Sequence, residues 1–426
     1  MSRKLLIIGN GFDLAHGYPT RYENFLDFEN VFMNMWGGDA DSSELPENYK
    51  NELLKARNNG KISGSLSDKM LEELEFLFCM KYPDRTAEKR PESYSRKDID
   101  RMYGYLKGNI WYDYFSYVHQ EGLLKGENWI DFEAEISRVI QCIDDKELSP
   151  LDAVESLKKS YDDPDERQER KTSSQIHTYN NVTDFFNKNN GQVQKIADCN
   201  TIRDLSEMLW KELQSLTRAL EIYLSVLVPE MKSSHENSFP VDAIKPDCVL
   251  SFNYTDTYHR LYDRHNECEY SFIHGKCRNV HELSKGCCNM VLGIDEYLDA
   301  YDRDNRNYFP YFKKFAQTAI FRNSNRYKEW LSQMSDDFKR NEAVFSNTNS
   351  FIYEKDFSDI WIFGHSLDVS DKSVLNEFLS PDFTSVHVYV NQDDPNDKLR
   401  HVTNLINIVG EGTFNKKKDA SLLEFC

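Results

Sequence analysis

Short apolar runs bounded by turn residues indicate where the strands of this chain lie. Five runs are clear and a sixth is weaker: residues 5–8, 248–252, 270–273, 360–363 and 386–390, with 290–292 as the weaker one. The runs are continuously apolar rather than alternating, which is typical of strands that are buried on both faces of a parallel sheet. The pattern therefore predicts an α/β protein with a mostly parallel sheet.

Segments with a helical spacing of apolar residues separate these strands. Thr20 and Glu23 form a capping-box pattern that predicts a helix through Phe32. Further helices are predicted over residues 67–80, 128–144, 201–226 and 394–408, and over 307–333 with a break near Asn323. In the longest of them, five leucines trace one face and predict a buried stripe: Leu205, Leu209, Leu213, Leu216 and Leu220.

The strand pattern leaves a long interval without strands, from about residue 35 to residue 235. If the chain formed separate domains in series, the first strand would have no partners for its backbone groups. We therefore expect one α/β core, residues 1–34 and 236–426, that is interrupted by an inserted α-helical domain, residues 35–235.

Composition narrows the classes of function. The chain of 426 residues has 52 Lys and Arg against 71 Asp and Glu, a net charge of −19. This surplus disfavours general nucleic-acid binding, because phosphates are bound by basic residues. No apolar run approaches the roughly 18 residues that span a bilayer, and the first run is too short for a signal peptide. We expect a cytoplasmic protein without membrane contact.

The nine cysteines are an odd number in a long chain, which is typical of reduced thiols rather than of a disulfide framework. The densest group of metal-ligand residue types comprises Cys268, His274, Cys277, His281, Cys287 and Cys288. Their spacing contains no Cys-x-x-Cys pair of the kind that zinc ribbons use. No metal is therefore expected.

Glycine or polar residues directly follow four of the predicted strands. The four loops are residues 9–13, 253–256, 274–275 and 364–368. Because ligands bind beyond the carboxyl ends of the strands in a parallel α/β sheet, four such loops predict one convergent site. Gly9 and Gly11 let the backbone turn sharply and approach a ligand. The third glycine of the dinucleotide fingerprint Gly-x-Gly-x-x-Gly is absent, because position 14 is Leu.

Structural roles are alternatives for each of these residues. The first loop can be a plain strand-to-helix turn, and Asn253 can cap a helix or bridge loop backbone. His274 can be a strand-end histidine bonded to a carbonyl, and Ser366 or Asp368 can cap the next helix. Their common position at strand ends favours a functional site.

Several of these motifs resemble those of a known family. Residues 9–20, Gly-Asn-Gly-Phe-Asp-Leu-Ala-His-Gly-Tyr-Pro-Thr, resemble the opening signature of the AbiH family of phage abortive-infection proteins. Later motifs of that family are resembled, in the same order, by Trp-Ile-Asp-Phe-Glu at 129–133, Ser-Phe-Asn-Tyr-Thr at 251–255, Ile-His-Gly at 273–275 and Gly-His-Ser-Leu at 364–367. The resemblance spans about residues 4 to 375 and implies a role in anti-phage defence, in which an infected cell shuts itself down.

The order of these elements is also similar, more distantly, to sirtuin-like domains, which bind NAD and which in several defence proteins hydrolyse it. This resemblance implies a Rossmann-like core in which Gly9 and Gly11 approach the diphosphate. The cofactor-binding residues that it implies are Gly9, Asn10, Gly11, Phe12, Tyr254, Asp256, Gly275, Gly364, His365 and Ser366. Asn10 stands where sirtuins have Ala, and the sirtuin zinc module is missing. Protein deacylation is therefore disfavoured, while NAD hydrolysis stays open.

Three residues are the candidates for catalysis. By the same resemblance, Asn253 lies at the nicotinamide ribose and His274 is the base. Hydrolysis of NAD builds oxocarbenium-like charge on the sugar, and a histidine with a pKa near working pH can accept a proton from the water. Asp13 can stabilise the cationic sugar or orient His274, with Asp256 as a competing candidate. Tyr18 or Phe12 can stack on a ring of the ligand.

Rival functions belong to other classes. The same site can bind a small nucleotide as a signal without cleaving it, in a homo-oligomer or with a partner protein of a defence system. Arg260 and His265 have the Arg-x-x-x-x-His spacing of some helical ribonuclease toxins. Glu133 can enter the site from the helical domain, or the Trp-Ile-Asp-Phe-Glu motif can simply begin a helix with Trp129 and Ile136 buried.

Overall fold

A computed structural model describes most of the chain. The described residues are 3–38, 46, 48–82, 94–121, 132–144, 154, 173–232, 241–279, 282–283, 288–294, 309–321, 326–346, 357–392 and 394–426. They form two compact units. The sheet unit comprises Met1–Tyr18, Lys232–Lys276 and Arg322–Cys426, and the helical unit comprises Pro19–Met231 and Cys277–Phe321.

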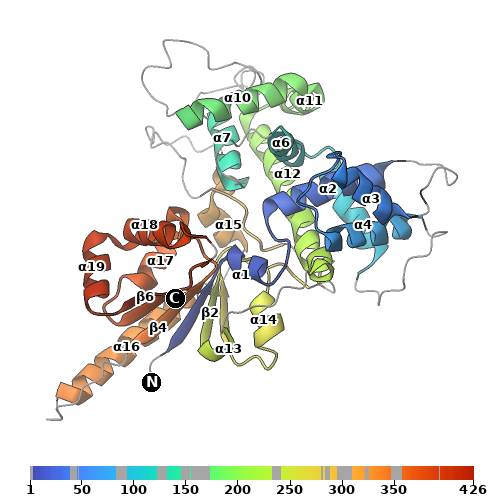
Figure 1. Cartoon of the computed structure of the whole chain (residues 1–426). Helices are drawn as coiled ribbons and strands as arrows, with labels where there is room; N and C mark the ends of the chain where they lie inside the picture. Colours follow the sequence, from blue (N-terminus) through green and yellow to red (C-terminus); the bar gives the residue numbers. More distant parts are fainter. Residues whose placement is uncertain are drawn as a thin grey trace. The chain divides into compact units, whose positions relative to one another are not determined.

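The sheet unit alternates strands with helices along the chain (Figure 1). Its strands are β1 Lys4–Ile8, β2 Cys248–Ser251, β3 Glu269–Phe272, β4 Ser358–Phe363, β5 Thr384–Val388 and β6 Leu423–Phe425. Its helices are α1 Asn10–Ala15, α13 Val241–Ile244, α14 Thr257–Tyr262, α16 Tyr327–Ser346, the short 3-10 turn η4 Val369–Asp371, α17 Lys372–Leu379, α18 Asp397–Val409 and α19 Glu411–Asp419.

The six strands form one parallel sheet in the order β3-β2-β1-β4-β5-β6. This is the strand order of the doubly wound Rossmann fold, in which the chain starts at a central strand and builds outward in both directions. The direction of building reverses between β1 and β4, where Ile8 is paired with Phe363. The predicted α/β, Rossmann-like class is confirmed.

Each face of the sheet packs against helices. Side chains on one face, such as Leu5, Ile7 and Val386, share a core with residues of α16, α17, α18 and α19. On the other face, Leu6, Ile8 and Val249 pack against α1, α13 and α14. Figure 1 shows α17, α18 and α19 beside the part of the sheet that contains β4 and β6. Residues 5–8 of β1 are buried from both sides of the sheet and are continuously apolar.

The helical unit contains no strand in the part that the structure describes. Its helices are α2 Tyr22–Gly37, α3 Tyr49–Asn58, α4 Asp68–Lys81, α5 Arg96–Leu106, α6 Ile110–Gln120, α7 Phe132–Asp144, α10 Ser173–Lys188, α11 Asn190–Ala197, α12 Ile202–Ile222, the π-helix η1 Tyr223–Leu227, the 3-10 helix η2 Val228–Met231, the 3-10 helix η3 Pro310–Phe312 and α15 Lys314–Phe321. The leucine stripe of α12 is buried as predicted. No described helix of the chain is long and apolar enough to cross a membrane.

Two local predictions are wrong. Residues 290–292 are buried but form no strand, because the side-chain amide of Gln317 bonds both the N–H and the carbonyl of Leu292. The sixth strand is β6, which is only three residues long. Helix α2 begins at Tyr22 rather than at Thr20, since the side chain of Asn24 accepts the backbone N–H of Arg21 at 3.2 Å.

The two units divide the chain differently from the expected domains at residues 35 and 235. The helical unit begins at Pro19, because α2 packs against the helices that follow it. It also takes in the later segment Cys277–Phe321. The sheet unit is therefore assembled from three separate stretches of chain.

Candidate functional site

The loops after β1 and β4 are bonded to each other at the carboxyl edge of the sheet. The N–H of Gly9 donates to the carbonyl of Phe363 at 3.2 Å, and the N–H of Gly11 donates to the carbonyl of Gly364 at 2.8 Å. A Cβ on Gly364 would lie 2.1 Å from the backbone nitrogen of Phe12, and its φ is +65°. These glycines therefore let two backbones pass closely, and the N–H groups of Gly9 and Gly11 are already used within the protein.

Asn253 joins the loop after β2 to the loop after β1. Its side-chain N–H donates to the carbonyl of Gly9 at 3.0 Å, and its backbone N–H donates to Oγ of Ser251 at 3.1 Å. The expected bridging of loop backbone is thus present. In the part of the chain that the structure describes, the amide oxygen of Asn253 makes no hydrogen bond. The side chain is fixed at one end and offers an oriented carbonyl dipole at the other.

Two histidines flank one carboxylate at the same edge. Nε2 of His274, in the loop after β3, lies 3.3 Å from Oδ1 of Asp371. Nε2 of His365, in the loop after β4, lies 3.4 Å from Oδ2 of the same residue. The ring of Phe252 contacts both imidazoles, with centroid distances of 5.8 Å to His274 and 4.3 Å to His365. The four loops therefore meet, as expected.

The hydrogen bonds of this cluster indicate its protonation. The backbone N–H of Leu367 donates to Nδ1 of His365 at 2.9 Å, so a neutral His365 carries its proton on Nε2, which faces Asp371. Burial alone would raise the pKa of Asp371, but hydrogen bonds from His274 and His365 hold it well below its usual range. An ionised Asp371 that accepts the Nε2 proton of His274 leaves Nδ1 of His274 as the basic nitrogen.

Asp371 is the residue of this cluster that sequence reasoning missed. It lies at the end of η4, directly before α17, and it was not among the candidates drawn from the sequence. The neighbouring Asp368 is the N-cap of η4 and accepts the N–H of Ser370 at 2.9 Å, as the capping alternative proposed. The signal in the sequence was a second acidic residue in the loop after β4.

Asp13 lies in α1 and is buried. Oγ1 of Thr255 donates to its Oδ2 at 2.5 Å, while its Oδ1 has no hydrogen-bond partner in the part of the chain that the structure describes. Burial raises the pKa of Asp13 to about 6, against a smaller opposing effect of the bond from Thr255. Asp13 thus contacts the loop after β2, whereas the carboxylate beside His274 belongs to Asp371.

The raised pKa of Asp13 predicts a pH dependence of stability. The folded protein binds this proton more tightly than the unfolded chain does, so ionisation destabilises the fold as pH rises from the unfolded pKa near 3.8 to above about 6. Asp13→Asn cannot ionise. Its unfolding free energy relative to wild type is expected to rise by about 1 kcal/mol between about pH 5 and about pH 8. Denaturant unfolding at the two pH values measures this, and a pH-independent difference would contradict it.

Asp256, the competing carboxylate, is paired with two cations. Its oxygens lie 2.8 Å from Nε of Arg260 and 2.9 Å from Nζ of Lys276. Although burial opposes it, the nearby Lys276 and Arg260 lower the pKa of Asp256. The guanidinium of Arg260 also lies over the ring of Tyr18, at 5.3 Å. Both carboxylate oxygens of Asp256 are therefore engaged in ion pairs within the protein, which is typical of a structural residue.

Some residues of the first motif, residues 9–20, belong to the hydrophobic core and not to the candidate site. Phe12 is fully buried against Phe363 and Tyr258, so it offers no surface for stacking on a ligand. His16 bonds the carbonyl of Phe12 through Nδ1 and the hydroxyl of Tyr262 through Nε2, both at 2.6 Å. The motif therefore locks α1 against α14 as well as shaping the loop after β1.

The remaining predicted binding residues lie on the same loops. Asn10 and Ser366 are exposed, Tyr254 is half-buried, and Gly275 is buried with a φ of +77°. The left-handed backbone at Gly275 turns the chain directly after His274, which is a conformation that favours glycine.

Three other sequence hypotheses fall outside this cluster. Residues 129–131 lie outside the described residues, and Glu133 forms an ion pair with Lys314 at 2.7 Å within the helical unit. Arg260 lies in helix α14, which ends at Tyr262, and His265 lies beyond the end of that helix. Of the Cys and His residues between 268 and 288, for which no metal was expected, Cys268 contacts the carbonyl of Pro246 at 3.0 Å, and Cys287 and His281 lie outside the described residues.

The strand order, and the polar groups gathered where that order reverses, define the sheet unit as a Rossmann-like α/β fold. The chain matches a family model, Bacteriophage abortive infection AbiH, over residues 5–391. It belongs to the AbiH family, and the resemblance of its motifs to that family is confirmed. Neither a curated protein nor a solved structure matches the chain significantly.

Proposed function

We propose that the sheet unit binds NAD, or a closely related nucleotide, at its carboxyl edge and hydrolyses the bond between nicotinamide and ribose. The observation that carries this proposal is the His274–Asp371 pair, which lies at the ligand-binding edge of a Rossmann-like sheet. Loss of NAD would shut down an infected cell, which is the outcome that abortive infection requires.

The chemistry needs little acid assistance. Nicotinamide is cationic in NAD and leaves as a neutral group when the C–N bond breaks, so positive charge passes to the ribose. The amide carbonyl of Asn253, whose oxygen makes no hydrogen bond within the described residues, is a dipole that can face this charge. A water then attacks the sugar and gives its proton to Nδ1 of His274, while Asp371 holds the imidazole and stabilises its charged form. The products are nicotinamide and ADP-ribose.

The diphosphate contacts differ from those that the sirtuin resemblance implies. Because the N–H groups of Gly9 and Gly11 bond to backbone carbonyls, they are not available to phosphate oxygens. The exposed Asn10 and Ser366 on the same two loops are the groups that we assign to the phosphate and adenosine side of the ligand. Gly364 then acts through backbone packing, and His365 through Asp371.

Release of nicotinamide tests the proposed reaction. Purified protein is incubated with NAD, with and without a lysate of phage-infected cells, and free nicotinamide is followed. Asn253→Ala removes the carbonyl dipole and is expected to slow release about 100-fold. Because it also removes the bond to Gly9, the melting temperature of the variant is measured in parallel. Release by a folded Asn253→Ala protein at the wild-type rate would contradict the mechanism.

A nucleotide sensor is the second candidate, and one observation favours it. Asn253, Gly9 and Gly11 all serve to tie the loops together, which is a role that a binding site needs without any reaction. A sensor is stabilised by its ligand through mass action. Thermal stabilisation by NAD without release of nicotinamide would therefore favour the sensor over the hydrolase.

A further inference from the structure

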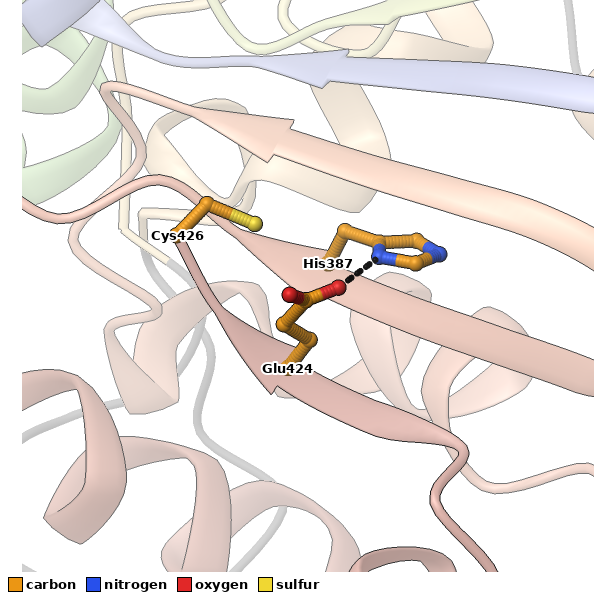
Figure 2. Close-up of side chains that lie close together, drawn as sticks. All are labelled: His387, Glu424 and Cys426. Carbon is orange, nitrogen blue, oxygen red and sulfur yellow. Dashed lines mark hydrogen bonds and ion pairs between the residues drawn. The ribbon is translucent and has the colours of Figure 1, made fainter.

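Three side chains of metal-ligand type come together on β5 and β6, at the edge of the sheet that is far from β3. His387 lies on β5, Glu424 lies on β6, and Cys426 directly follows β6. Figure 2 shows the three side chains together on one face of the two strands. One potential ligand atom from each lies within 4.8 Å of the other two, and Nδ1 of His387 is 3.1 Å from Oε2 of Glu424.

Strand geometry produces this grouping. His387 and Glu424 are register partners in the parallel pair β5–β6. Glu424 and Cys426 are two residues apart, so their side chains point to the same face of the sheet. The intervening apolar residues point to the other face, where Val386, Val388 and Phe425 pack against the helices. The three ligand-type side chains are thus directed away from that core, and Glu424 is exposed.

The imidazole of His387 is held on its far side. Nε2 lies 3.5 Å from Oγ of Ser385 and 3.8 Å from Oδ1 of Asp359, and the Ser385 hydroxyl donates to Asp359 at 2.6 Å. The ring also stacks on Trp361, with a centroid distance of 4.1 Å and an interplanar angle of 12°. A histidine that binds a metal through one nitrogen commonly gives the N–H of the other to a carboxylate, which fixes the tautomer.

We propose that His387, Glu424 and Cys426 form a binding site for a borderline-soft divalent cation of the Zn²⁺ type. Imidazole nitrogen, carboxylate oxygen and thiolate sulfur are all zinc ligands, whereas Mg²⁺ and Ca²⁺ favour oxygen alone. Nδ1 of His387, a carboxylate oxygen of Glu424 and Sγ of Cys426 supply three positions, and a water supplies the fourth. The site is separate from the His274–Asp371 cluster and does not depend on NAD chemistry.

The geometry needs only a small adjustment. Ligand atoms about 2.0–2.3 Å from a tetrahedral zinc ion lie roughly 3.3–3.8 Å from one another. The three ligand atoms now lie within 4.8 Å of one another, so the longest of these separations must shorten by about 1 Å. Rotation of the Glu424 and Cys426 side chains allows this change. The cation replaces the hydrogen bond between His387 and Glu424 and links β6 to β5. We therefore infer that metal stabilises this short edge strand.

Cobalt provides the decisive probe, because a thiolate ligand gives Co²⁺ a sulfur-to-metal charge-transfer absorption. The full chain is stripped of metal with a chelator, titrated with Co²⁺ and then with Zn²⁺. One equivalent of Co²⁺ is expected to produce the band, and Zn²⁺ is expected to remove it. Cys426→Ser should abolish the band, and Asp359→Asn should weaken affinity about tenfold by removing the support of His387.

Cys199→Ser is the matched control, since Cys199 is a half-buried thiol in the helical unit. It is expected to leave the band and the stoichiometry unchanged. Zn²⁺ should also raise the melting temperature of wild type and of Cys199→Ser but not that of Cys426→Ser. A melting transition of Cys426→Ser without metal shows separately that this variant folds. Absence of a charge-transfer band in wild type, or the same band in Cys426→Ser, would overturn the proposal and leave the group as an edge ion pair.

Discussion

Asp371→Asn is expected to slow nicotinamide release about 1,000-fold while changing the KM for NAD much less. The carboxylate of Asp371 faces Nε2 of both His274 and His365. An asparagine has one oxygen and one NH₂ group there, so one of the two histidines meets a donor and loses its orientation. The rate falls because the base is misplaced or takes the wrong tautomer, whereas the loops that bind the ligand are unchanged.

A pH profile separates this positioning role from a general loss of structure. If Asp371 acts through His274, the pH dependence of kcat should differ between the variant and wild type. Asp368→Asn is the matched control, since it lies three residues earlier and, within the described residues, its carboxylate caps η4. It should release nicotinamide at the wild-type rate. Equal losses in both variants, with lowered melting temperatures, would show that the acidic loop is structural.

Gly364→Ala is expected to destabilise the sheet unit by about 4 kcal/mol or more, enough to prevent folding of this unit under ordinary conditions. Two costs add. The φ of Gly364 is +65°, which an L-residue adopts only with strain. In addition, the new Cβ would lie 2.1 Å from the nitrogen of Phe12 and 2.4 Å from the carbonyl carbon of Gly11. Both contacts are backbone atoms, which cannot rotate away.

Gly410→Ala separates the two costs. Gly410 follows α18 with a φ of +81°, but a Cβ there would meet nothing within 4 Å. Only the backbone strain applies, and with a ψ of 151° it lies in a region that is essentially restricted to glycine, so a loss of about 1–3 kcal/mol is expected. Soluble yield and denaturant unfolding of the two variants provide the comparison. Similar losses in both would show that the loops after β1 and β4 do not need their close approach.

Sequence pattern predicted the parallel sheet because its central strands are buried on both faces. Residues 5–8 and 360–363 are continuously apolar for that reason, and their loops were located correctly from the glycines that follow them. The edge strand β6 was missed, since three residues with Glu424 at the centre carry no such pattern. The apolar run at 290–292 was wrongly predicted as a strand. An irregular segment can be equally buried when a side chain, here that of Gln317, forms the hydrogen bonds of its backbone.

The candidate site was predictable in its loops but not in its contacts. The position of Asn253 and His274 after strands followed from order along the chain. Their partners did not, because a carboxylate as distant in sequence as Asp371 is paired with His274 only by the fold. The glycines had two readings, approach to a ligand or approach to another backbone, and only the three-dimensional arrangement distinguishes them.

The central position of β1 has a consequence for synthesis of the protein. β1 leaves the ribosome before its two neighbours, because β2 begins only at residue 248 and β4 only at residue 358. An apolar strand must therefore wait, unpaired, while the helical unit is being translated, and such a strand is a target for chaperones. Asp371 is made later still than β4, so the proposed site lacks this carboxylate until residue 371 has been made.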